Sequence, residues 1–252
     1  MENIKITAQY PTMEVKDGDV TYQTEKNWTE RPAWIKLVNW KKPTPRFLSV
    51  RVPGYGELIY KAFGRYYCPI DYTNDEERRF MDGMAGEYDA MVSDVFNTPM
   101  AKMLLARLPL KKINKEAHIF DVGCGTGIMS ELLLKEGFSR FTLVDFSEGM
   151  LAHAKKKLAS SQIINYKRVD ITKELPKGMF DVVVSVMLFN SFDNKMTDNI
   201  LSRFVKQMSE KAIFGVVEDA EKLAYTKYFK PIINEMVDVG TRTKYIFVGI
   251  KK

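Results

Sequence analysis

The chain has 252 residues, of which 45% are hydrophobic and 28% charged, and its formal net charge is +6. This composition is typical of a folded protein with a substantial core and excludes a disordered or fibrous chain. The length suits one large domain with an appendage. Two cysteines and two histidines exclude a disulfide framework and argue against a metal site built from protein side chains.

The N-terminal residues, MENIKI, lack the basic start and apolar stretch of a signal peptide. Nowhere does the chain contain a run of about 18 apolar residues, the length that a membrane span needs. We therefore expect a cytoplasmic protein without a membrane span. Residues 3–24 are predicted to form two short strands joined by Asp17 and Gly18, a pair typical of hairpins.

The positive charge is concentrated in residues 31–67, here called the basic segment, where eight basic residues oppose one acidic residue. Aromatic residues alternate with the basic ones, and five prolines interrupt residues 31–69. Three interpretations remain open: a cap over an active site that faces an anionic substrate, a grip on single-stranded nucleic acid, or packing on the core. The prolines favour the cap. We therefore expect an N-terminal extension over residues 1–70 and the main domain over residues 71–252.

The rest of the chain alternates helical and strand patterns. Helices are expected over residues 74–93, where Asn74 and Glu77 could form a capping box, and over 98–107, before the alternation begins at residue 117. Strands are expected over residues 117–122, 141–145, 163–169, 180–188, 212–217 and 244–250. Helices are expected over residues 128–136, 147–158, 195–208 and 220–237. This pattern predicts an α/β protein with a Rossmann-like, doubly wound, mostly parallel sheet.

Three glycines, at positions 123, 125 and 127, lie between the first of these strands and its helix. A strand, a glycine turn and a helix N-terminus together favour an anionic ligand. A nucleotide P-loop is excluded, because the loop closes with Thr126, Gly127 and Ile128 and supplies no lysine. A dinucleotide fingerprint is disfavoured but stays open, because its sixth position, counted from Gly123, is Ile128 and not glycine.

Carboxylates at the strand ends indicate a different ligand. Asp121 precedes the loop, where it would repel a pyrophosphate but could accept a hydrogen bond from an ammonium group. Asp145 ends the second strand, where it could accept both ribose hydroxyls, and Phe146 could lie against an adenine ring. Asp170 follows the third strand and could accept from the adenine amine. Together these residues predict an adenosine site with an amino-acid tail in place of the phosphates.

The sequence resembles the class I S-adenosylmethionine-dependent methyltransferases over roughly residues 84–218. The resemblance is carried by four motifs in register: FDVGCGTG at 120–127, VDFSEGML at 144–151, VDI at 169–171 and FDVVV at 180–184. It implies S-adenosylmethionine as cofactor, with Tyr88 on a lid near the cofactor carboxylate. The residues expected to bind the cofactor are Asp121, Gly123, Cys124, Gly125, Gly127, Asp145, Phe146, Met150, Asp170, Ile171 and Met187.

The sequence departs from the family pattern at two places. Only 12 residues follow Gly240, enough for one strand where the family has an antiparallel pair, so we expect either a lost strand or a substitute from the N-terminal hairpin. Residues 187–192 lack both the Asn-Pro-Pro-aromatic signature of many nucleic-acid methyltransferases and the histidine of many small-molecule ones. They therefore leave the acceptor open.

Methyl transfer from a sulfonium relies mainly on positioning, so a general base is optional. Tyr88 and Asn190 are our candidates for catalytic residues, and further candidates are Ser191, Glu218 and Asp219. Structural or surface roles are expected for His118 and His153, and Cys124 is expected to be a small packing residue. The lysines at 155–157 are expected to form a solvated helix end. The predicted function is methylation of a small molecule, aromatic or anionic; the alternatives are an RNA methyltransferase that uses the basic segment and a non-catalytic cofactor-binding regulator.

Overall fold

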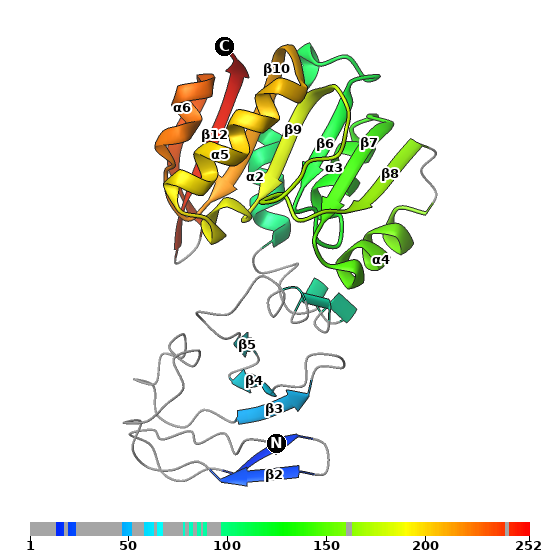
Figure 1. The fold of residues 1–252 in the computed structure, drawn as a ribbon, viewed down its shortest axis with the longest axis vertical. Coiled ribbons are helices and arrows are strands. Elements are labelled where there is room, and N and C mark those ends of the chain that lie inside the picture. The colour runs from blue at the N-terminus through cyan, green and yellow to red at the C-terminus, as the bar shows by residue number, and fades with distance from the viewer. Residues whose placement is uncertain are drawn as a thin grey trace. The chain divides into compact units, whose positions relative to one another are not determined.

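The structure is a computed structural model of the chain (Figure 1). It describes residues 14–17, 20–23, 47–51, 58–62, 65–67, 78, 81–82, 85–86, 88–89, 97–159, 163–239 and 242–252. The chain divides into two compact units, Met1–Met84 and Ala85–Lys252. The expected domain boundary at residue 70 and most of the expected helix over residues 74–93 lie outside the described residues, so both stay predictions.

The first unit contains a five-stranded sheet of order β2-β1-β3-β4-β5. The strands are β1 (Glu14–Asp17), β2 (Val20–Gln23), β3 (Phe47–Arg51), β4 (Leu58–Ala62) and β5 (Arg65–Tyr67). The predicted hairpin is confirmed, because β1 and β2 pair antiparallel with Asp17 opposite Val20. The side chains of the basic segment lie outside the described residues, so its three interpretations all stay predictions.

The second unit is built on a seven-stranded sheet of order β11-β12-β10-β9-β6-β7-β8. Its strands are β6 (His118–Val122), β7 (Arg140–Asp145), β8 (Ile163–Arg168), β9 (Phe180–Val186), β10 (Met208–Glu218), β11 (Phe229–Val239) and β12 (Arg242–Lys251). The five strands from β6 to β10 run parallel, and β12 pairs antiparallel with both β10 and β11. The doubly wound, mostly parallel fold is confirmed.

Helices cover both faces of this sheet (Figure 1). The α-helices are α2 (Thr98–Arg107), α3 (Ile128–Lys135), α4 (Glu148–Lys157), α5 (Asn194–Phe204) and α6 (Leu223–Tyr228), with short 3-10 turns η3 (Leu110–Lys112), η4 (Phe189–Ser191) and η5 (Val205–Gln207). One apolar cluster joins α2, α3 and α4 to one face of the sheet, and a second joins α5 and α6 to the other. The helix predicted over residues 195–208 is shorter in the structure, because α5 ends at Phe204 and the next turn tightens into η5.

The predicted helix over residues 220–237 is wrong. Only α6 is helical there, and β11 replaces the remainder. Pro231 has no N–H for an internal helical hydrogen bond but is tolerated at the irregularity between Pro231 and Ile233 in this edge strand. The pairing of β11 with β12, from Phe229 opposite Lys251 to Val239 opposite Arg242, also corrects the expected sheet edge. The antiparallel pair is complete within this unit.

The strand predicted over residues 180–188 also ends early, at Val186. Met187 has a φ of +62°, a left-handed conformation that few residues other than glycine adopt, and η4 follows. The chain therefore turns away from the sheet at the carboxyl end of β9. The sheet order reverses between β6 and β9, and in open α/β sheets ligands bind in the crevice at such a point.

Candidate functional site at the carboxyl edge of the sheet

The glycine loop, residues 123–127, links β6 to α3 through a tight left-handed turn. Its glycines have φ values of +63° at Gly123, +52° at Gly125 and +83° at Gly127. A Cβ at Gly123 would approach Leu188 Cδ1 to 2.8 Å, whereas one at Gly125 would meet nothing within 4 Å. The loop therefore needs glycine for its conformation, and at Gly125 it faces open space.

Asp145, at the end of β7, holds the glycine loop in place. Its carboxylate accepts one hydrogen bond of 2.9 Å from the N–H of Gly125 and another of 2.9 Å from the N–H of Ser147. Ser147 in turn caps α4, its side chain accepting from the N–H of Met150. The carboxylate predicted to bind ribose thus also orders the loop and the start of the next helix.

Asp121 is a buried carboxylate directly before the loop. Its side chain is 2% exposed, and Oδ2 accepts a hydrogen bond of 2.5 Å from the Ser130 hydroxyl. Burial raises the pKa of Asp121 to about 7, with a contribution from the charge of Asp145, while bonds from Ser130 oppose the rise. A cation beside this carboxylate would relieve the burial of its negative charge. Asp121 is therefore suited to an ammonium group, as the sequence predicts.

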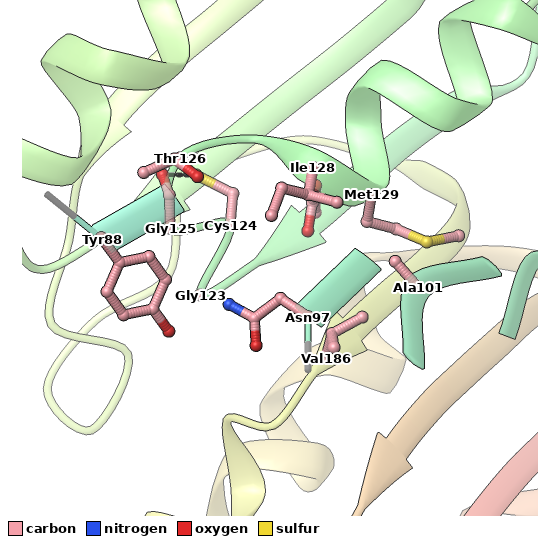
Figure 2. Close-up of a pocket in the computed structure, with 11 residues that line it drawn as sticks. Tyr88, Asn97, Ala101, Gly123, Cys124, Gly125, Thr126, Ile128, Met129 and Val186 are labelled. Atoms are coloured by element: carbon pink, nitrogen blue, oxygen red, sulfur yellow. Dashed lines mark hydrogen bonds between the residues drawn. The ribbon is translucent and has the colours of Figure 1, made fainter. Parts of the chain in front are cut away.

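A cavity opens between the glycine loop and the start of α2 (Figure 2). Its lining includes five predicted site residues and six others, Asn97, Ala101, Thr126, Ile128, Met129 and Val186; the predicted ones are Tyr88, Asp121, Gly123, Cys124 and Gly125. Burial raises the pKa of Tyr88, and the Asn97 side chain hydrogen-bonds to it. The Tyr88 hydroxyl is therefore protonated at neutral pH and lines the cavity beside the loop, while its role as a lid stays a prediction.

Three polar side chains that sequence reasoning missed tie the segment around Tyr88 to the glycine loop. The Thr126 hydroxyl donates to Asp89, and Lys157 Nζ contacts Asp89 Oδ2 at 2.5 Å and Thr126 Oγ1 at 3.3 Å. The expectation that Lys157 is solvated is wrong, because its side chain is 23% exposed and ion-paired. Its neighbours Lys155 and Lys156 are exposed, as expected. The spacing of Lys157 in the last turn of α4 gave no sign of this contact.

The remaining residues predicted to contact adenosine lie outside the lining of this cavity. Phe146 is half-buried, whereas Met150 and Ile171 are buried in the core. Asp170 accepts hydrogen bonds from the N–H and hydroxyl of Thr172 and contacts Lys173 Nζ at 3.0 Å. Burial raises the pKa of Asp170, but these donors outweigh burial and lower it overall. Their roles in binding stay predictions.

The carboxyl ends of β9 and β10 form the other half of the edge. Glu218, the last residue of β10, is fully buried and accepts hydrogen bonds from the N–H groups of Phe189 and Asn190, at 3.0 and 3.1 Å. Burial raises the pKa of Glu218 to about 8, although these bonds oppose the rise. The Asn190 amide oxygen accepts from the N–H of Asp219 at 2.9 Å. Glu218 therefore orders the η4 turn that presents Asn190, while Ser191 is exposed.

Lys244, near the start of β12, completes this half, and sequence reasoning missed it. Its side chain is 2% exposed, and its ammonium is paired with Asp219, whose side chain is 57% exposed. It also contacts Met187 Sδ at 3.9 Å. The sequence offers one sign of this site: a lysine directly before the buried run Tyr245–Val248. Because a charged residue is rarely buried without a partner, such a lysine indicates an ion pair.

Three further residues have structural surroundings. Burial raises the pKa of the Cys124 thiol well above its ordinary value, so this residue packs as a small apolar group. His118 lies between Met179 O at 3.1 Å and Thr142 Oγ1 at 2.9 Å, at the far edge of the sheet. His153 lies half-buried on α4. These surroundings agree with the expected structural roles.

In the part of the chain that the structure describes, no helix is long and apolar enough to cross a bilayer. Nor do His, Cys, Asp and Glu side chains gather there in groups of three or more that could hold a metal ion.

Comparisons with known proteins agree with this geometry. Residues 119–211 match the family model described as a methyltransferase domain. The core also resembles the crystal structure of the N-methyltransferase NodS from Bradyrhizobium japonicum WM9 in complex with S-adenosyl-L-homocysteine, with a TM-score of 0.53 and 14% identity over 60% of this chain and 85% of that one. Residues 119–211 are thus a methyltransferase domain, and the described core has the fold of the class I S-adenosylmethionine-dependent methyltransferases.

Curated relatives of this methyltransferase domain carry different names. The chain is 36% identical over 83 residues to malonyl-[acyl-carrier protein] O-methyltransferase 1 of Ilyobacter polytropus, covering 32% of this chain and 31% of that protein. It is 31% identical over 118 residues to the ribosomal protein L11 methyltransferase of Thermotoga neapolitana, covering 46% and 44%. The chain thus spans less than half the length of each of these two relatives.

Proposed function

We propose that this protein transfers a methyl group from S-adenosylmethionine to a small-molecule acceptor. The observation that carries this proposal is the buried carboxylate of Asp121 beside a glycine loop whose middle glycine faces open space. A nucleotide-phosphate site would need positive charge at this position. A buried carboxylate instead suits the ammonium end of an amino-acid tail.

The residues present fit this cofactor. Asp121 would pair with its ammonium group, and the N–H groups of the glycine loop would bind its carboxylate. Asp145, at the end of β7, would take the ribose hydroxyls while it keeps its bonds to the loop. The same proposal includes the remaining residues predicted to bind the cofactor, among them Gly127, Phe146, Met150, Asp170, Ile171 and Met187.

When bound, the cofactor supplies an electrophilic methyl group on its sulfonium sulfur. The protein contributes position and the exclusion of water. We assign Tyr88 to the second task, because its side chain lines the cavity beside the loop and hydrogen-bonds to Asn97. Asn190 stays a candidate for orienting the acceptor, because its side chain lies at the carboxyl end of the sheet between Met187 and Asp219.

The nature of the acceptor is the finer part of the proposal. The two relatives named above are named for different acceptors, so they favour no single class. The small number of polar side chains gathered at the ends of β9 and β10 supports a small-molecule acceptor. One amide from Asn190, one carboxylate from Asp219 and one ammonium from Lys244 can satisfy one polar group of a ligand.

Calorimetry with S-adenosylhomocysteine tests the cofactor. We expect saturable binding to the full chain and a loss of at least about tenfold in Asp121→Asn, because a hydrogen bond to a charged group contributes about 1.5–3 kcal/mol. Asp198→Asn is the matched control, since Asp198 pairs with Lys227 on the surface. Absence of binding to the unaltered chain would refute the proposal.

Transfer of labelled methyl groups tests the acceptor. The protein is incubated with methyl-labelled S-adenosylmethionine and a cell extract that has been separated into small molecules, RNA and protein. We expect label in the small-molecule fraction, at a rate reduced in Asp121→Asn. Label confined to RNA or protein would contradict the small-molecule acceptor, and label in no fraction would favour a non-catalytic cofactor-binding protein.

A further inference from the structure

Two hydrogen-bond donors meet at one sulfur atom in the half of the edge formed by β9 and β10. Asn190 Nδ2 lies 3.4 Å from Met187 Sδ, and Lys244 Nζ lies 3.9 Å from the same atom. A thioether sulfur is a weak acceptor, much poorer than an oxygen. The amide therefore meets only a weak acceptor at this point, whereas the ammonium is also paired with the carboxylate of Asp219.

The burial of Lys244 requires an explanation. Removing an ammonium from water is costly, and a buried ion pair is often no more stable than apolar side chains of the same volume. Lys244 is nevertheless 2% exposed, on the face where Ile246 and Val248 of the same strand are packed in the core. Its partner Asp219 is 57% exposed and therefore can turn into solvent. Asp219 therefore stabilises the charged form of Lys244, and another carboxylate could take its place.

Met187 connects this point to the cavity beside the glycine loop. Its neighbour Val186 lines the cavity, while the Met187 side chain contacts Asn190 and Lys244. Met187 also has the left-handed φ of +62°, and such strained conformations cluster at functional sites. Its unbranched side chain can change rotamer and uncover both donors.

We propose that Lys244 and Asn190 form a subsite that recognises a carboxylate group of the methyl acceptor. This inference rests on the proposed function and gives its acceptor a chemical class. The ammonium is already held by a carboxylate, that of Asp219, so an acceptor carboxylate replaces it in kind. One of its oxygens then takes the Asn190 amide, which exchanges a weak sulfur contact for a bond to a charged oxygen.

The charged groups that face Lys244 agree with this assignment. Asp219 contributes one negative charge to the pair, and Glu218 is bonded to the N–H groups of Phe189 and Asn190. When Asp219 turns outward, the ammonium stays as the charge next to Met187. A neutral acceptor that displaced Asp219 would give the buried ammonium no negative charge in exchange, which is unfavourable.

Binding of small carboxylates, here benzoate and malonate, tests the subsite directly. Benzoate and malonate are titrated by calorimetry at about pH 7 into the full chain, with and without saturating S-adenosylhomocysteine, and compared with the uncharged benzamide and malonamide. We expect at least one carboxylate to bind and its amide not to bind. We expect Lys244→Met to weaken this binding at least tenfold and Asn190→Leu to weaken it several-fold.

Two further variants separate recognition from a structural role. Asp219→Asn removes the competing carboxylate, so we expect carboxylates to bind several-fold more tightly; a purely structural pair would show no such gain. Lys227→Met removes a lysine on the surface and should change nothing. Circular dichroism and thermal melting confirm that each variant is folded.

The outcomes distinguish this inference from the proposed function. If S-adenosylhomocysteine binds but no carboxylate does, or if Lys244→Met binds carboxylates as the unaltered chain does, the subsite is refuted and the methyltransferase proposal stands. If phenyl phosphate binds in place of the carboxylates, the carboxylate assignment is wrong. If S-adenosylhomocysteine does not bind, the proposed function fails, and the titration without it still decides the subsite.

Discussion

The two halves of the carboxyl edge use acidic residues in opposite ways. In the half proposed to bind the cofactor, here called the cofactor half, at the ends of β6 and β7, Asp121 and Asp145 accept hydrogen bonds from a hydroxyl and from backbone N–H groups. In the half proposed to bind the acceptor, here called the acceptor half, at the ends of β9 and β10, Asp219 is paired with the buried Lys244. We propose that the buried carboxylate of Asp121 takes a cation, whereas the other half already holds the cation of Lys244 and takes an anion.

The difference also concerns distance along the chain. The cofactor half is built mainly from residues 121–147, so its loop, strand end and helix cap form one local unit. The acceptor half brings together residues 187, 190, 219 and 244, which come from four separate elements or their ends. Local motifs can be recognised by spacing, while a site of the second kind exists only after the sheet has formed.

Asp121→Asn should have the largest effect and should be confined to the cofactor half. We expect binding of S-adenosylhomocysteine to weaken about 10- to 100-fold, because a charge-assisted hydrogen bond is lost. Carboxylate binding at Lys244 should persist in the same variant. Calorimetry with both ligands measures this, and equal losses at both sites would show that the two halves are not independent.

The pH dependence of cofactor binding should follow Asp121. Its pKa is raised to about 7 in the folded protein, so its carboxylate is protonated below that pH and cannot pair with an ammonium group. Affinity for S-adenosylhomocysteine should therefore fall by up to about tenfold per pH unit below 7, and this dependence should be absent in Asp121→Asn.

The same residue affects the stability of the protein without ligand. Because the folded pKa lies above the ordinary value of 3.8, the unfolded chain releases this proton first, and stability contributed by Asp121 is lost as pH rises from about 4 to about 7. Asp121→Asn should remove this loss. Thermal melting of the ligand-free protein at several pH values measures it, and parallel curves for both proteins would contradict the assignment.

Two glycine variants in the cofactor half separate the cost of a left-handed backbone conformation from the steric effect of an added methyl group. Gly123→Ala should destabilise the protein by about 2–4 kcal/mol, because a left-handed φ is combined with a close approach to Leu188. Gly125→Ala should cost about 1–2 kcal/mol for its conformation alone, but its methyl group would enter the open space and weaken cofactor binding. Urea denaturation and calorimetry separate the two effects.

The pair in the acceptor half should respond asymmetrically to substitution. Asp219→Asn should lower the free energy of unfolding by about 1–3 kcal/mol, because it leaves a buried ammonium without its carboxylate; the exposure of Asp219 keeps the loss below that of a fully buried pair. Lys244→Met should change it by less than about 1 kcal/mol. Urea denaturation checks both values, and a larger loss in Lys244→Met would indicate a mainly structural lysine.

The smallest expected effects come from two helix caps, one in each half. Ser147 accepts from the N–H of Met150 at the start of α4, and Asp193 accepts from the N–H of Met196 at the start of α5. Replacing either by alanine should cost about 1 kcal/mol. Ser147→Ala should also weaken cofactor binding slightly, because it keeps the N–H that donates to Asp145 but loosens the helix start that positions this donor, whereas Asp193→Ala should leave binding unchanged.

Where the sequence-based predictions are wrong, the structure is determined by contacts with residues distant in the chain. The pattern predicts a helix over residues 220–237, but Pro231 and several β-branched residues disfavour one, and pairing with β12 makes residues 229–239 a strand. The sequence likewise predicts a solvated Lys157, whereas Asp89, 68 residues earlier, pairs with it. Neither pairing can be read from local propensity, because the partner is supplied by another element of the folded domain.

The sequence by itself determined the parallel core, the glycine turn and the carboxylates at the ends of β6 and β7. These features depend on short-range rules: the alternation of strands and helices, the need for glycine at positive φ, and the capping of α4 by Ser147. Only the tertiary structure decided the antiparallel edge and the meeting of Lys244, Asn190 and Met187. That meeting requires β12 to return beside β10, so that a buried lysine reaches the turn after β9.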